Sequence, residues 1–163
     1  MKIGLMADTH DRLDAVNAAI NLFNQEKVTD VLHAGDLVSP FVVPSFSRLK
    51  ARLHYVWGNN EGDREYIVVK FKEIGIVPHG DFAELEINGF KIALLHGRYE
   101  AIINSLANSG RYNVIVRGHN HKAEIIKGKT LLINPGEVCG YLSGRMTVAL
   151  LYLDSMRSEI IEL

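Results

Sequence analysis

The first residues read MKIGLMADTHDRLDAVNAAINLF (residues 1–23), and they decide the start of the fold. A short run of alternating apolar residues predicts a strand: Ile3, Leu5 and Ala7. The polar stretch Asp8-Thr9-His10-Asp11 predicts a loop, and apolar residues then recur at helical spacing at Leu13, Val16, Ile20 and Phe23. We expect a strand, a loop and a helix, with Asp11 in position to cap the helix.

The same order of strand and polar loop recurs twice in the first half of the chain. Short apolar runs at residues 31–33 and 53–57 predict strands, and they are followed by Gly35-Asp36 and by Gly58-Asn59-Asn60. The first half is therefore βαβ-like.

The second half is richer in strands. Asn88-Gly89 lies between two apolar runs and predicts a hairpin turn. We expect a helix over 99–109 that ends at Gly110, a strand over 114–116, and mostly strands over 122–163 with turns at 127–129 and 154–155. Together the halves predict two packed sheets with helices outside. The apolar run 148–153 fits a core strand or a subunit interface.

Length and composition limit the class of protein. A chain of 163 residues is the size of one domain, so we expect residues 1–163 to form one. A net charge of -1 does not favour a broad nucleic-acid-binding surface. Cys139 is the only cysteine, which excludes an internal disulfide framework, and we expect it to be a small buried residue. The chain has neither a secretory-type leader nor a long apolar run, so we predict no membrane span and a cytoplasmic location.

Five polar clusters follow predicted strands, and together they indicate a metal site. They are Asp8-x-His10, Gly35-Asp36, Gly58-Asn59-Asn60, His96-Gly97 and Gly118-His119-Asn120-His121. Loops at strand ends can gather ligands that are distant in the sequence. In an extended segment residues i and i+2 point to one side, so each Asp-x-His or His-x-His pair would face one cavity. Carboxylate, imidazole and amide donors suit ions such as Mn, Fe, Co, Ni or Zn.

Three other histidines have a simpler interpretation. His33 lies inside the strand before Asp36, so we expect a core residue or one that supports the site. His54 and His79 have no motif around them, and we expect solvated or edge positions for both.

With these motifs in order, the chain resembles the calcineurin-like metallophosphoesterases, in particular their short prokaryotic phosphodiesterase branch. The family pattern D-x-H, G-D, G-N-x, H-G and G-H-x-H is present, and the family's Asn-Pro-Gly segment matches Asn134-Pro135-Gly136. The resemblance spans nearly the whole chain. It implies an α/β fold, a four-layer αββα sandwich of two mixed sheets flanked by helices, with two divalent metal ions at the strand ends.

The resemblance also implies the role of each site residue. Asp8, His10 and His121 would hold the first metal, Asn59, His96 and His119 the second, and Asp36 would bridge both. Mn²⁺ is the favoured ion, with Ni²⁺, Fe²⁺, Co²⁺, Zn²⁺ or Mg²⁺ left open. The implied activity is hydrolysis of a phosphate ester, with a diester favoured, by a metal-bridging hydroxide that attacks phosphorus. Two such ions outweigh the two carboxylates and the hydroxide, so the cavity would attract an anionic small-molecule or nucleotide-type substrate.

Two positions depart from the family pattern. Asn60 stands where many relatives carry a histidine that resembles a general acid, and an amide cannot deliver a proton. We expect Asn60 to bind a phosphoryl oxygen, and we expect the rate to depend steeply on the leaving-group pKa. Arg98 also replaces a histidine, and its guanidinium could clamp a phosphate oxygen.

Two rival functions and the state of assembly stay open. The chain could be a catalytically weak or inactive protein-binding scaffold with the same fold, or a metal-dependent hydrolase of a non-phosphate substrate. The presence of all seven expected ligands favours the phosphoesterase. A homo-oligomer is neither predicted nor excluded.

Overall fold

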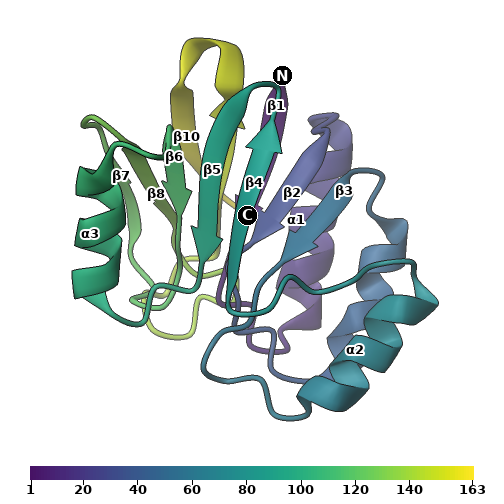
Figure 1. Ribbon diagram of the computed structural model, residues 1–163. Helices are drawn as coiled ribbons and strands as arrows, with labels where there is room; N and C mark the ends of the chain where they lie inside the picture. Colours follow the sequence, from purple (N-terminus) through teal and green to yellow (C-terminus); the bar gives the residue numbers. More distant parts are fainter.

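The computed structural model describes residues 1–163 and arranges ten strands in two five-stranded sheets (Figure 1). The first sheet has the order β10-β9-β1-β2-β3 and comprises β1 (Lys2–Met6), β2 (Asp30–His33), β3 (Arg52–Tyr55), β9 (Thr147–Tyr152) and β10 (Arg157–Glu162). The second has the order β4-β5-β6-β8-β7 and comprises β4 (Phe82–Ile87), β5 (Phe90–Leu95), β6 (Val114–Val116), β7 (Ala123–Ile126) and β8 (Leu131–Pro135). Parallel pairing joins β2 to β1 and β3, and joins β6 to β5 and β8, while the other pairs are antiparallel. Both sheets are therefore mixed.

Helices cover the outer face of each sheet. The first sheet is covered by α1 (Leu13–Gln25), the 3-10 helix η1 (Pro40–Arg48) and α2 (Arg64–Glu73), whereas α3 (Glu100–Ser109) covers the second. Figure 1 shows α3 on one flank and α1 and α2 on the other. A short 3-10 helix, η2 (Leu153–Ser155), joins β9 to β10. These layers confirm the predicted αββα sandwich.

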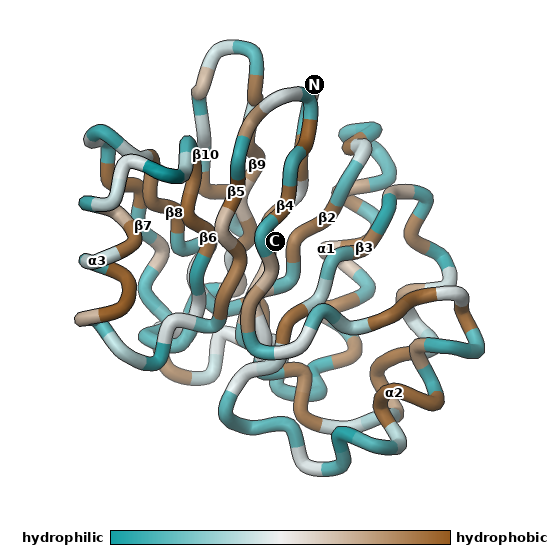
Figure 2. Tube along the Cα trace, in the orientation of Figure 1, coloured by the Kyte–Doolittle hydropathy of each residue, from teal (hydrophilic) through white to brown (hydrophobic).

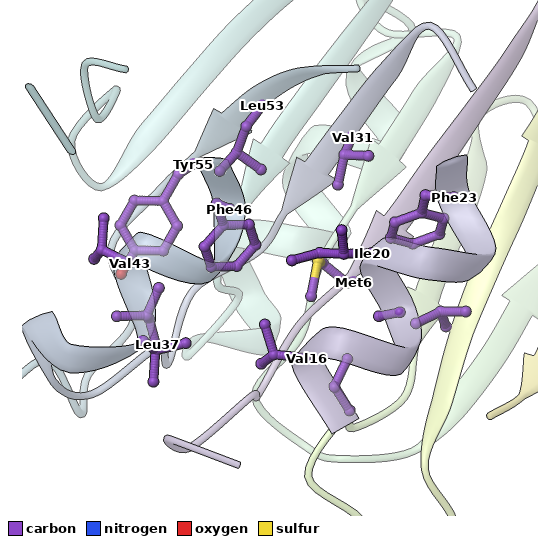
Figure 3. Close-up of a cluster of buried hydrophobic side chains, with 14 of the residues drawn as sticks. Met6, Val16, Ile20, Phe23, Val31, Leu37, Val43, Phe46, Leu53 and Tyr55 are labelled. Carbon is purple, nitrogen blue, oxygen red and sulfur yellow. The ribbon is translucent and has the colours of Figure 1, made fainter. Parts of the chain in front are cut away.

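Three apolar clusters hold the four layers together. Seventeen buried residues, among them Ile3, Leu5 and Ile92, form the cluster between the two sheets. Nineteen more, among them Ile20 and Phe23, pack α1, η1 and α2 on the first sheet (Figure 3). Six pack α3 on the second. Because both of their faces are covered, central strands such as β6 and β8 are buried along their whole length. Figure 2 shows apolar stretches along strands of both sheets.

Several elements lie where the sequence predicts them. Asn88 and Gly89 both have positive φ (52° and 79°) and turn the β4–β5 hairpin. Helix α3 ends at Gly110, which has φ 69°. Residues 148–151 are buried in β9 at 0–1% exposure, so core packing accounts for this apolar run. The strand predicted over 53–57 ends two residues early, at Tyr55, and α2 and η1 were not foreseen.

The prediction that Asp11 caps α1 is wrong. The N-cap is Arg12, and no side chain caps that helix end. Asp11 precedes it, and its Oδ1 instead accepts hydrogen bonds from the backbone N–H and the hydroxyl of Ser39, both at 2.9 Å. Asp11 therefore joins the loop before α1 to the loop before η1.

Of the solvated or edge positions predicted for His54 and His79, His79 is exposed, and His54 lies on β3, an edge strand of the first sheet. His54 is only 8% exposed, and its Nε2 lies 3.0 Å from Oδ1 of the buried Asp30 on the neighbouring strand β2. Its Nδ1 lies 3.2 Å from Nε2 of His79. A histidine with polar partners on both ring nitrogens can be buried at low cost.

None of the helices combines the length and the apolar character that a membrane span requires.

Because β1 lies close to α1, we expect the stability of the protein to be sensitive to substitution of Gly4. A Cβ atom there would lie 2.7 Å from two ring carbons of Phe23, which is buried. We expect Gly4→Ala to lower the free energy of unfolding by about 1–3 kcal/mol through overpacking, as measured by urea denaturation. The matched control is Gly128→Ala, whose new Cβ would meet nothing closer than 3.6 Å. Equal stability of the two variants would contradict this packing.

Candidate metal centre

The five polar clusters meet at one edge of the molecule. They follow the carboxyl ends of β1, β2 and β3 in the first sheet and of β5 and β6 in the second. Parallel strands bring their carboxyl ends to the same edge of a sheet. In Figure 1, β2, β3 and β5 all end toward the lower side of the view. The inter-sheet cluster holds the two edges together.

The backbone of the site loops is left-handed rather than extended. Five of the site residues have positive φ: Asp8 (50°), His10 (39°), Asp36 (59°), His119 (76°) and His121 (59°). The expectation of extended Asp-x-His and His-x-His segments is therefore wrong, although the paired side chains still converge. Non-glycine residues in this region cost roughly 1–3 kcal/mol each and cluster at functional sites. Backbone bonds between the first two loops hold this conformation, for example from the N–H groups of Thr9 and His10 to the Asp36 carbonyl, both 3.0 Å.

One group of donors comes from Asp8, His10, Asp36 and His121. Their donor atoms all lie within 4.8 Å of one another. Nε2 of His10 is 3.4 Å from Oδ2 of Asp36, and Nε2 of His121 is 3.5 Å from Oδ1 of Asp8. Two atoms of this group, Asp8 Oδ1 and His10 Nε2, are buried without a hydrogen-bond partner. Buried polar atoms normally have partners, so this donor set fits a metal ion.

A second group surrounds the other oxygen of Asp36. Nε2 of His96 lies 3.4 Å from Asp36 Oδ1, 3.0 Å from Asn59 Oδ1 and 3.3 Å from Nδ1 of His119. The two oxygens of one carboxylate thus face two separate sets of donors. All seven residues that the sequence predicts as ligands are brought together.

Two glycines make room for the carboxylates. A Cβ at Gly58 would lie 2.0 Å from Asp36 Oδ1, and a Cβ at Gly118 would lie 2.6 Å from Asp8 Oδ2. Only glycine permits this approach.

Burial shifts the pKa values of the carboxyl and imidazole groups of the site. Burial raises the pKa of Asp8 to about 7; the His121 charge opposes this rise, and the nearby charge of Asp36 adds to it. Burial also acts to raise the pKa of Asp36, but the His96 charge and hydrogen bonds from Asn60 outweigh it and lower that pKa. Burial lowers the pKa of three histidines, His10, His96 and His119. Neutral imidazole is the form that binds metals.

Asn60 supports Asp36 directly. Its backbone N–H donates to Oδ1 at 2.9 Å and its Nδ2 donates to Oδ2 at 2.7 Å. The side-chain amide is therefore engaged with a carboxylate, and its contact with a phosphoryl oxygen stays a prediction.

Glu137 is a site residue that the sequence analysis missed. It is fully buried, and its Oε2 accepts a hydrogen bond from Nδ1 of His121 at 2.6 Å. Burial opposes its ionisation, but hydrogen bonds, first from His121 and then from Ser143, lower the pKa of Glu137 to about 2. Such a carboxylate fixes the tautomer and orientation of a ligating histidine. The available signal was its place directly after Asn134-Pro135-Gly136.

His33 supports the site from the core, as predicted. It is fully buried, its Nδ1 accepts from the Gly35 N–H at 3.1 Å, and its Nε2 lies 3.3 Å from the Thr9 hydroxyl. Burial lowers the pKa of His33 to about 3, so the ring stays neutral. It joins the loops that carry Asp8 and Asp36.

Cys139 is buried, as predicted, but it lies closer to the site than expected. Its Sγ is within 4.8 Å of donor atoms of His10 and His121. Burial raises the pKa of the thiol to about 12, so it stays protonated, and Sγ contacts Oε2 of Glu137 at 3.2 Å. Without a bound ion, Cys139 is therefore a thiol that donates a hydrogen bond to Glu137.

Arg98, the predicted phosphate clamp, lies at the border of the centre. It is exposed, and its guanidinium lies 5.4 Å from the ring centre of Tyr99. It lines a cavity that Asn59 and His96 also line. Its role toward phosphate stays a prediction.

Burial of Asp8 predicts a pH-dependent stability in metal-free protein. Because its pKa in the folded protein is about 7 against an ordinary 3.8, the folded state holds an extra proton between these values. The parent should lose stability as pH rises through this window. We expect the free energy of unfolding of Asp8→Asn to equal that of the parent near pH 3.8. Above about pH 7 it should exceed the parent's by roughly 2–4 kcal/mol. Urea unfolding in the presence of a chelator measures the difference.

The control for this experiment is Asp81→Asn, whose carboxylate is 81% exposed. Its stability difference from the parent should not change across the same pH window. A constant difference between parent and Asp8→Asn would contradict the account.

Comparison with known proteins agrees with this arrangement. The family model for the calcineurin-like phosphoesterase superfamily domain matches residues 1–156. A phosphodiesterase of Methanocaldococcus jannaschii is 39% identical over all of this chain and 98% of its own length. A probable metallophosphoesterase of Methanothermobacter thermautotrophicus is 31% identical over 83% of this chain and 76% of its own.

Solved structures show the same relationship. The structure of an archaeal phosphodiesterase superimposes with a TM-score of 0.95 at 38% identity, and the alignment covers all of both chains. Vacuolar protein sorting 29 of Cryptosporidium parvum shares the fold at a TM-score of 0.70 and 18% identity, over 99% of this chain and 96% of its own. The match of the family model and the similarity to the archaeal phosphodiesterase place this chain in the calcineurin-like phosphoesterase superfamily.

Proposed function

We propose that this protein is a phosphodiesterase that works with two divalent metal ions. The observation that carries the proposal is the position of Asp36, whose two carboxylate oxygens face histidine nitrogens of two separate sets of donors. The unpaired buried atoms Asp8 Oδ1 and His10 Nε2 support it further. The preference for a diester rests on the similarity to the archaeal phosphodiesterase.

The proposed ligands divide into two sets around Asp36. Asp8, His10 and His121 would hold one ion, Asn59, His96 and His119 the other, and Asp36 would contact both. When bound, two such ions, for which we propose manganese, supply positive charge for the phosphoryl oxygens and a hydroxide nucleophile near neutral pH.

The chain's own residues prepare the donor atoms. Glu137 accepts a hydrogen bond from Nδ1–H of His121, and the Ala34 carbonyl accepts one from Nδ1–H of His96 at 2.8 Å. Both imidazoles are therefore left with an Nε2 lone pair that faces the centre. Asn60 fixes both oxygens of Asp36. These contacts orient the donors before a ligand arrives, which lowers the cost of binding.

The substrate side of the proposal depends on charge. A centre that holds two divalent ions against two carboxylates attracts an anion, so the substrate is a small phosphate ester, including nucleotide-type esters. The side chain at position 60 is an amide that donates to Asp36, which agrees with the expected steep dependence on the leaving group. That dependence and the cytoplasmic location stay predictions, and the oligomeric state stays open.

The test compares hydrolysis of bis-para-nitrophenyl phosphate and para-nitrophenyl phosphate by chelator-treated protein with and without added Mn²⁺. We expect little activity without metal, recovery with Mn²⁺, and faster cleavage of the diester. Asp36→Asn should lower the rate by roughly 100-fold or more, because replacing even an outer partner of a metal ligand typically costs about 10–100-fold.

The matched control is Asp154→Asn, which lies in the turn between β9 and β10. It should keep the parent's rate. Full metal occupancy without cleavage of either ester would reject the enzyme and favour a protein-binding scaffold. Equal rates with and without metal would reject the metal-dependent mechanism.

A further inference from the structure

A cavity of about 360 Å³ opens directly beside the candidate metal centre. Asn59 and His96, two of the proposed ligands, form part of its wall. The rest comes from the loop after β3, the start of α2, the residue before β4, the end of β5, and the segment that leads into and begins α3. Its volume falls within the range of roughly 300–1,000 Å³ that is usual for small-molecule sites. A group attached to a phosphoryl at the metal centre can therefore extend into it.

Aromatic and apolar side chains line much of this cavity. Trp57, Tyr99 and Ile102 belong to its wall, together with Leu95. Tyr99 is 57% exposed and Ile102 is 49% exposed, so both leave apolar surface open to solvent. Exposed apolar surface gathered at a concave site is typical of ligand binding.

Two arginines lie against the aromatic rings of the same cavity. The guanidinium of Arg64 is 5.4 Å from the ring centre of Trp57, and its Nη2 donates to the Gly58 carbonyl at 2.9 Å. Arg98 is at the same distance from the ring centre of Tyr99. Stacked guanidinium groups extend flat surfaces and keep N–H donors at their edges. With Asp81 as the one acidic lining residue, the wall has a surplus of positive charge.

We propose that this aromatic cavity binds the planar aromatic group of a phosphate ester whose phosphoryl group lies at the metal centre. The proposal rests on the proposed function, and it narrows the substrate class to nucleotides and other esters that carry a flat ring. Bases stack on aromatic side chains with little dependence on their identity, and arginine adds a cation–π contribution. A purely aliphatic ester would gain neither interaction.

The test uses binding rather than turnover. Calorimetry on the Mn²⁺-loaded protein compares adenosine monophosphate with ribose phosphate, which has the same phosphate but no ring. We expect adenosine monophosphate to bind at least about five-fold more tightly, in line with the gain from stacking one base. Trp57 is the only tryptophan of the chain, so its fluorescence reports occupancy of the cavity. Adenosine monophosphate should quench this fluorescence saturably, and ribose phosphate should not.

Two variants locate the binding site. Tyr99→Ala and Ile102→Ala should each weaken the binding of adenosine monophosphate and leave the binding of ribose phosphate unchanged. Both side chains are exposed enough to be truncated without loss of the fold. The control is Tyr66→Ala, an aromatic residue of α2 that is 43% exposed and does not line the cavity. Equal affinity for the two ligands, or an unchanged affinity in Tyr99→Ala, would overturn the proposal.

The outcome separates this proposal from the proposed function. If diesters are hydrolysed but the ring adds no affinity, the cavity proposal fails and the phosphodiesterase stands. If the ring adds affinity but no ester is cleaved, the proposed phosphodiesterase activity is rejected and the cavity proposal is kept. Absence of binding by both ligands overturns the cavity proposal.

Discussion

The buried carboxylate of Asp36 is the constraint on which the site depends. It is 1% exposed, it accepts two hydrogen bonds from Asn60, and it lies 3.4 Å from histidine nitrogens on both sides. A buried charge is costly unless it is paired, and burial lowers the pKa of the histidines around it, which favours their neutral form. Together with Asp8 it gives a pair of carboxylates without a full-charge partner. Cations at this position would remove that cost, which supports the proposed metal centre.

The fold supplies what this cluster needs. Parallel strands in each sheet end at one edge, and seventeen buried residues lock the two sheets so that their edges stay together. Left-handed backbone at residues such as Asp8 and His119 then turns the side chains inward, and Gly58 and Gly118 leave room for the carboxylates. The strain of these loops is offset by the rigid layers beneath them.

Local patterns predicted much of this arrangement, and long-range contacts account for what they missed. The β4–β5 hairpin and the end of α3 follow from turn residues, and the seven residues proposed as ligands, which the structure brings together, lie in polar motifs after strands. The cap by Asp11 failed because Ser39, distant in the sequence, supplies two donors. The burial of His54 on its edge strand was not predicted because its partner Asp30 lies on the neighbouring strand, distant in the sequence. Glu137 had only the Asn-Pro-Gly segment before it as a signal, since its role arises from contact with His121. Pro40 and Pro44 lie within η1, whose 3-10 geometry does not follow the α-helical period.

The central claim is that two ions share Asp36, and anomalous scattering at the manganese edge tests it most directly. Crystals of the parent protein grown with Mn²⁺ should show two peaks roughly 3.5–4 Å apart, one on each side of the Asp36 carboxylate. A single peak away from Asp36, or no peak at full Mn²⁺ supply, would contradict the account.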